Sequence, residues 1–181
     1  MNMSTSTPKN LNVSILLLII FCTAAGVLMH FAFDWSANSR IVALFAPVNE
    51  SIWEHEKLLF FPFVTGAYFL AARKNIVSGS FPCLLSVLSG LIFIPCAYYT
   101  YTGALGLQAD WFNIVIFILG VLISCLSYAR LLQASLPAYL SPVGEFLLLL
   151  LLALFLLFTF VPPRLPLFED PLTGSFGYQS Q

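Results

Sequence analysis

Residues 146–158 read FLLLLLLALFLLF, an unbroken apolar stretch inside a longer run, 143–161, whose only charged residue is Glu145. About 20 apolar residues are enough for a helix to cross the hydrocarbon core of a bilayer. The whole chain has the same character, because 60% of its 181 residues are hydrophobic and 8% are charged. A soluble domain carries about 25% charged residues. The sequence therefore predicts an integral membrane protein.

Four more apolar runs precede this one, at residues 11–33, 49–73, 80–101 and 111–130. The first is longer than the roughly 7–15 residues of a signal-peptide core, so we expect it to be retained as a span. The fold class is predicted to be all-α, an integral membrane bundle of about five transmembrane helices. The segment between the first two runs, 36–48, is too short to cross and is expected to lie in the interface or dip into the protein.

The domain organisation follows from these runs. Residues 1–10 are polar and expected to be disordered, and residues 11–161 form a single transmembrane domain. The tail, 162–181, is rich in proline and glycine, which favour turns and extended backbone. We expect the tail to fold over one face of the bundle, with Arg164 or Asp170 reaching into a polar cluster there.

The basic residues predict the orientation. With five spans, the N-terminal side of the membrane carries Lys9, Arg73, Lys74 and Arg130, and the other side carries Arg40, Arg164 and Lys57 at the head of the second span. Because Lys and Arg are enriched on the cytoplasmic side, we expect the N-terminus inside and the C-terminus outside.

This topology places seven of the eight acidic residues and both histidines at the outer face. They are Asp34, Glu50, Glu54, Glu56, Asp110, Glu169, Asp170, His30 and His55. Ionisable residues near a membrane are costly and usually face a cavity or the bundle interior. The asymmetry therefore predicts a functional site at the outer end.

The densest polar segment, 47–57, reads PVNESIWEHEK. If a helix begins near Asn49, then Glu50, Glu54 and Lys57 share one face at offsets of four and seven residues. In the first span, His30 and Asp34 are four residues apart, which is about one helical turn. The ends of these two helices are expected to pack together.

Three kinds of chemistry fit this cluster. Acid–base catalysis would use Glu50, Glu54, His55 and Lys57. A divalent metal such as zinc or manganese would take His30, Asp34, Glu54 and His55 as ligands. A proton relay or ion site of a transporter would use the same groups.

Plainer interpretations stand beside these. Glu54 suits the first turn of any helix, Lys57 can form a structural ion pair, and His30 can hydrogen-bond Asp34. The metalloprotease spacing H-E-x-x-H, the G-x-S-x-G nucleophile motif and a glycine-rich phosphate loop are all absent from the sequence.

The composition limits which partners the protein is expected to bind. A net charge of -1 gives no basic surface for nucleic acid, so none is expected. The four cysteines lie in apolar runs without C-x-x-C spacing and are expected to be small hydrophobic residues. The expected partners are the lipid bilayer and a lipid-like ligand, and the oligomeric state stays open.

Two stretches, PVNESIWEHEKLLFFP at 47–62 and PPRLPLFEDPLTGSFGY at 162–178, resemble the signatures of a family of small bacterial multi-spanning membrane proteins of unknown function. The resemblance covers nearly the whole chain. It implies a fold of about five spans in a bacterial plasma membrane, and it implies no activity. The matching motif positions are Asn49, Glu50, Ser51, Trp53, Glu54, His55 and Lys57.

The leading hypothesis is a small membrane-embedded enzyme or metal-binding protein whose outward-facing site hydrolyses a lipid-like substrate. One alternative is an ion- or proton-coupled transporter, although the sequence lacks the internal repeat common in transporters. Another is a non-catalytic assembly protein in which the charged motif locks helix ends together.

Overall fold

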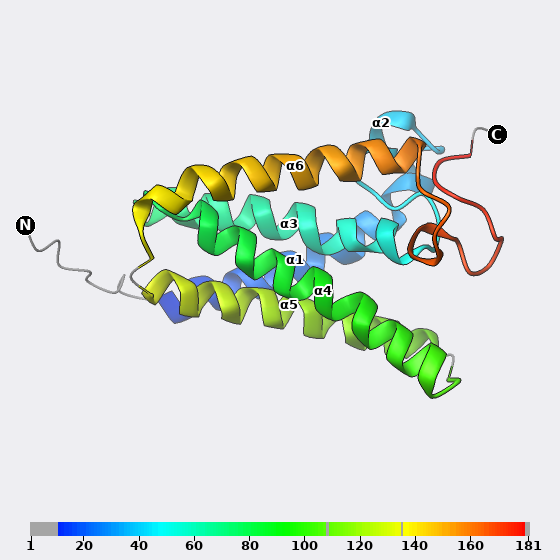
Figure 1. Cartoon of the computed structure of the whole chain (residues 1–181), viewed down its shortest axis with the longest axis horizontal. Helices are drawn as coiled ribbons and strands as arrows, with labels where there is room; N and C mark the ends of the chain where they lie inside the picture. The colour runs from blue at the N-terminus through cyan, green and yellow to red at the C-terminus, as the bar shows by residue number, and fades with distance from the viewer. Residues whose placement is uncertain (1–10, 108, 135, 180–181) are drawn as a thin grey trace, which may run out of the picture.

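Five long helices lie side by side in the computed structural model, which describes residues 11–107, 109–134 and 136–179 (Figure 1). They are α1 (Leu11–Trp35), α3 (Ile52–Arg73), α4 (Ser80–Tyr99), α5 (Asp110–Gln133) and α6 (Ser141–Phe160). Shorter elements are α2 (Arg40–Ala43), the π-helical turn η1 (Thr100–Ala104), and the 3-10 turns η2 (Ala138–Leu140) and η3 (Pro166–Phe168). The predicted all-α bundle is confirmed, and the expectation for residues 1–10 lies outside the described residues.

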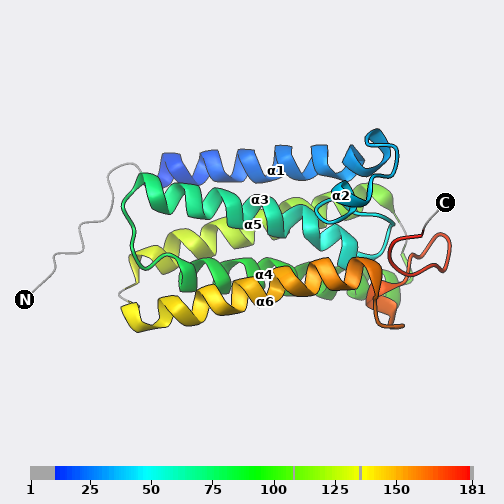
Figure 2. The same cartoon turned by 90° about the horizontal axis from the view of Figure 1, so that it is seen from above.

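Four helical segments are long and apolar enough to cross a membrane: Leu11–Trp35, Ser80–Ala104, Trp111–Gln133 and Ala138–Phe160. α3 differs from them because Glu54, Glu56 and Lys57 stand in its first two turns. Its 22 residues still make a helix about 33 Å long, and it runs beside the others in both views (Figure 2). The fifth helix of the bundle is thus a spanning-length helix with a polar head.

The outer surface of the bundle suits lipid. Leu16 and Leu17 of α1 are 56% and 60% exposed, and Phe146 and Leu149 of α6 are 66% and 64% exposed. Large apolar side chains in such numbers would be costly against water. α6 lies at the periphery, because only 22% of its 18-residue apolar window is buried.

α3 lies at the centre of the bundle and contacts α1, α4, α5 and α6. Leu59, Phe60 and Phe63 on its middle turns are at most 2% exposed. The helix continues through Pro62 from Ile52 to Arg73. Because α3 is packed on several sides, its polar head is carried to a fixed place at one end of the bundle.

That end gathers the end of α1, the short α2, the head of α3, the end of α6 and the tail (Figures 1 and 2). In the segment between α1 and α3, Ala43 and Ala46 are 0% and 1% exposed. Of the two expected arrangements, the segment therefore packs against the protein. The residues that the sequence predicts for a site converge at this end.

Candidate functional site

The head of α3 begins two residues later than the sequence suggests. Ser51 is the N-cap residue, since its Oγ accepts a hydrogen bond from the Glu54 N–H at 3.3 Å. Asn49, near which the sequence suggests that the helix begins, instead uses its Oδ1 to accept from the Ser51 N–H at 3.0 Å. The prediction that Glu50 continues the helical face of Glu54 and Lys57 is wrong, because Glu50 lies in the loop before the helix.

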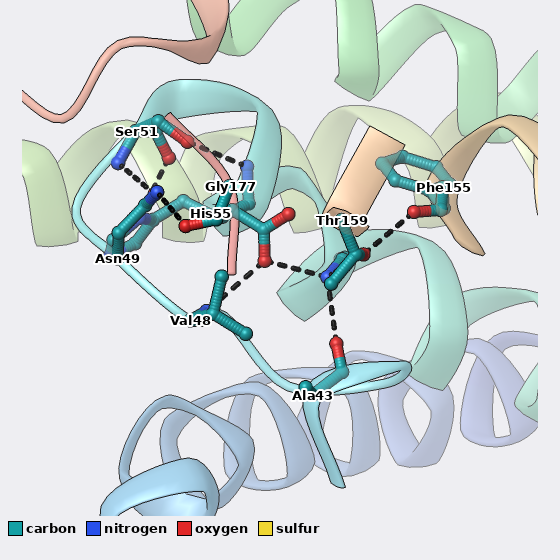
Figure 3. Close-up of polar contacts among 10 residues, drawn as sticks. Ala43, Val48, Asn49, Ser51, His55, Phe155, Thr159 and Gly177 are labelled. Atoms are coloured by element: carbon teal, nitrogen blue, oxygen red, sulfur yellow. Dashed lines mark hydrogen bonds and ion pairs between the residues drawn. The ribbon is translucent and has the colours of Figure 1, made fainter. Parts of the chain in front are cut away.

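Glu54 and Lys57 form a buried ion pair, and Figure 3 labels the residues that bond to this pair, Val48, Ala43 and Thr159. The Lys57 ammonium donates to Glu54 Oε2 at 2.6 Å, to Thr159 Oγ1 at 2.6 Å and to the Ala43 carbonyl at 3.0 Å. These three acceptors match the three protons of an ammonium group. The side chains of Lys57 and Glu54 are 0% and 1% exposed. Together they tie α2, α3 and α6 to one another.

Glu54 also holds the preceding loop. Its Oε2 accepts from the Val48 N–H at 3.1 Å, while its Oε1 is buried and has no hydrogen-bond partner among the described residues. Neighbouring Trp53 packs against Phe155 of α6 and Phe168 of η3, with ring centroids 4.6 Å and 4.9 Å apart. The first turn of α3 is therefore fixed from several directions.

His55 faces away from this pair and toward Glu50. Its Nδ1 lies 3.1 Å from the Ser51 carbonyl oxygen. Because a carbonyl only accepts, Nδ1 carries the proton of this hydrogen bond. Nε2, the ring nitrogen that Ser51 does not engage, lies 3.3 Å from Glu50 Oε2, a distance at which the two groups form an ion pair when the ring is protonated. A histidine that donates one ring N–H to a backbone carbonyl has the arrangement that metal ligands usually have.

His30 completes the group from α1, with its ring centroid 5.1 Å from that of His55. One ligand atom each from His30, Glu50 and His55 lies within 4.8 Å of the other two. A tetrahedral zinc ion with bonds of about 2.0–2.2 Å separates its ligand atoms by roughly 3.5 Å. Shifts of about an ångström would therefore let all three hold one ion.

A cleft of about 60 Å³ opens beside this group. It is lined by His30, Phe33, Asp34, Pro47, Val48, Asn49 and Glu50. This exceeds the roughly 10–15 Å³ that one water molecule needs, so the cleft is large enough for water. Polar ligand atoms and water-sized space therefore occur together.

The predicted site residues divide into two groups. His30 and His55 come together, with Glu50 as the third potential ligand and Asp34 in the adjoining cleft. Glu54 and Lys57 belong to the buried pair instead. Sequence reasoning missed Thr159, and the only signal for it was a lone threonine in an otherwise apolar run.

The tail returns over the same end of the bundle. Tyr178 donates its N–H to the Thr159 carbonyl at 2.7 Å, and Asn49 Nδ2 donates to the Gly177 carbonyl at 3.3 Å. Asp170, expected to reach into the cluster, accepts from the Leu172 N–H at 2.9 Å and so stabilises its own turn.

No curated protein and no solved structure matches the chain. A family model does match it over residues 1–178, which includes both stretches, 47–62 and 162–178, that carry the resemblance noted in the sequence. The resemblance to a family without an assigned activity is thereby confirmed. The chain belongs to DUF6512, a family of unknown function.

Proposed function

We propose that this membrane protein binds a divalent transition-metal ion through His30, Glu50 and His55, and uses it to hydrolyse a lipid-like substrate. The observation that carries the proposal is the arrangement of His55. Its Nδ1 is engaged by a backbone carbonyl, which leaves Nε2 directed at Glu50 and close to His30.

The ligand set supports catalysis more than a purely structural metal. Catalytic zinc sites commonly have three protein ligands, such as two histidines and a glutamate, and keep a fourth position for water. Structural sites are usually closed by four protein ligands. Three potential ligands beside a cleft large enough for water match the open kind. Zinc is the first candidate, and manganese or ferrous iron suit the same donors.

Asp34 is the proposed general base. It lines the cleft together with His30 and Glu50, so it would take a proton from a water in the cleft. The water oxygen would form the new bond to the substrate's phosphorus or carbonyl carbon. The leaving oxygen would depart with the transferred proton.

The surroundings support a lipid-like substrate. Phe31 and Trp35, on the same turns of α1 as His30 and Asp34, stack with ring centroids 5.7 Å apart and are 45% and 70% exposed. Exposed aromatic residues are enriched where membrane proteins meet the headgroup layer. A site at this level would meet the polar part of a lipid.

Glu54 and Lys57 take a different role in this proposal. The buried pair holds the Val48 backbone and so supports the loop that carries Glu50. This is the locking role expected of a charged motif in an assembly protein, here placed next to a reactive site. The Lys and Arg bias supports an orientation with this end outside, and the family resemblance implies a bacterial plasma membrane.

Metal content by mass spectrometry tests the proposal. Wild type, His30→Ala, His55→Ala and the control Glu145→Ala would be purified in detergent without chelators and reloaded with zinc, manganese or ferrous iron. Glu145 is suitable because it bonds to Ser80 on α4, outside the His30–Glu50–His55 group. We expect one ion per chain in wild type and control, and loss in both histidine variants. Wild type that holds no ion after reloading would refute the proposal.

A further inference from the structure

Glu50 lies in a loop, so no helical hydrogen bonds fix its backbone. Residues 47–51 lie between α2 and α3 without regular structure, and the Glu50 side chain is 48% exposed. The position of this ligand therefore depends on the contacts that fix the backbone around it. Among the contacts of the described residues, two involve the residues just before Glu50, namely Val48 and Asn49.

The inner contact is the hydrogen bond from the Val48 N–H to Glu54 at 3.1 Å. The outer contact comes from the tail, where the Gly177 carbonyl accepts from Asn49 Nδ2 at 3.3 Å. Asn49 is adjacent to Glu50 in the chain, and its Oδ1 also binds the Ser51 N–H. One amide side chain thus connects the tail to the residues on both sides of the ligand.

The tail is itself anchored where it meets Asn49. The Tyr178 N–H donates to the Thr159 carbonyl at 2.7 Å. The Tyr178 ring packs against Phe33 of α1 and Phe160 of α6, with centroids 6.1 Å and 5.6 Å apart. Arg40 lies over the same ring at 5.7 Å. The end of the tail therefore contacts α1, α2 and α6.

Gly177 makes this close approach possible. Its φ is +61°, and a Cβ at this position would lie 2.7 Å from the Thr159 carbonyl oxygen and 2.8 Å from Pro162 Cδ. Any side chain would force the tail away from α6. The carbonyl that binds Asn49 belongs to the same residue and would move with it.

We infer that the end of the C-terminal tail is a positioning element of the metal site, because it holds the loop that carries Glu50. The inference rests on the function proposed above. Metal affinity should then depend on residues that do not touch the metal. Groups that orient metal ligands without touching the metal alter its affinity by about 10- to 100-fold.

Gly177→Ala is the first test, and Gly174→Ala is its matched control. Gly174 also has a positive φ, +68°, and lies in the same tail, but a Cβ there would meet its nearest atom only at 4.0 Å. The two variants introduce similar backbone strain, and only the first displaces the tail from α6. Asn49→Ala removes the same contact from the loop side and is the second test.

Two readouts separate this inference from the proposed function. Hydrogen–deuterium exchange of residues 47–51 in metal-free protein reports whether the tail holds the loop. Calorimetric titration with Zn²⁺ reports affinity. We expect faster exchange and about 10-fold weaker zinc binding in Gly177→Ala and Asn49→Ala, with Gly174→Ala like wild type.

Unchanged exchange in both variants would overturn the inference whatever the metal result. Faster exchange with unchanged affinity would overturn the positioning role, since the loop would then be held without benefit to the site. Wild type that binds no zinc would end the proposed function and the metal part of the inference together. The exchange data would still decide whether the tail holds the loop.

Discussion

The Lys57 ammonium donates a hydrogen bond to the Thr159 hydroxyl at 2.6 Å, across 102 positions of sequence. The carbonyl of the same threonine accepts from the tail at Tyr178. Thr159 is 0% exposed and therefore joins the buried ion pair of α3 to the C-terminal tail. The first two predictions concern this junction.

Lys57→Met is expected to destabilise the fold strongly. Removing one partner of a buried ion pair leaves an uncompensated charge and costs about 3–5 kcal/mol. The double variant Lys57→Met/Glu54→Leu removes both charges and should be more stable than Lys57→Met alone. Reversible unfolding in mixed detergent measures the free energy of each variant. If the double variant lost as much stability as the two single variants together, the result would contradict the pairing of Lys57 with Glu54.

Thr159→Val keeps the side-chain shape and removes the hydroxyl. The Lys57 ammonium loses one of three acceptors, and the free energy of unfolding should fall by about 1–3 kcal/mol. Thr100→Val is the control, because among the described residues the Thr100 hydroxyl bonds within its own turn, to the Cys96 carbonyl at 2.6 Å, at an exposed position. Equal losses in the two variants would show that the buried contact adds nothing.

Zinc should raise the thermal stability of the wild type. A ligand that binds only the folded state at 100 times its Kd adds about 2.7 kcal/mol. His55→Ala should abolish the rise in Tm, whereas Glu145→Gln should retain it. Thermal unfolding with and without zinc tests this, and a rise that persists in His55→Ala would place the ion elsewhere.

Asp34→Asn should separate binding from chemistry. Asp34 lines the cleft but is outside the group of three potential ligands, so the variant should keep its metal. Loss of a general base lowers the rate by about 10²–10⁴-fold. Hydrolysis of phospholipid and acyl-ester substrates in mixed micelles is the assay. A variant with full activity would remove Asp34 from the mechanism.

Gly90→Ala should loosen the crossing of α4 and α5. A Cβ at Gly90 would lie 2.2 Å from Ser124 Oγ and 2.9 Å from the Gly120 carbonyl oxygen. Overpacking of this kind costs about 1–3 kcal/mol. Gly103→Ala is the control, since a Cβ there meets no described atom within 4 Å. An unchanged Tm in Gly90→Ala would contradict the prediction, because α4 and α5 would then accommodate the added methyl group without loss of stability.

The positions of the helices could be predicted closely, because a helix that crosses a bilayer needs about 20 apolar residues. The start of α3 was harder, since Asn49 and Ser51 are both good N-cap residues. Local preference could not show that Asn49 binds the tail while Ser51 caps the helix. The shift of two residues moved Glu50 from a helical face into a loop. As a result Glu50, and not Glu54 or Asp34, lies with His30 and His55 as a potential metal ligand.

The meeting of His30 and His55 could be anticipated because each lies near the end of one of two helices adjacent in sequence. The acceptors of Lys57 could not. Ala43 contributes only a backbone carbonyl, and Thr159 lies in the last helix. Neither has a side-chain pattern that distinguishes it before the helices are placed.

The three acceptors of Lys57 also imply an order of assembly during synthesis. Ala43 and Glu54 leave the ribosome with α3, but Thr159 follows about a hundred residues later, at the end of α6. Until then the Lys57 ammonium lacks its third partner, and the polar head of α3 is incompletely buried. The last helix therefore completes a core that the second long helix begins, and a nascent chain that stops before α6 leaves the Lys57 ammonium without its third acceptor.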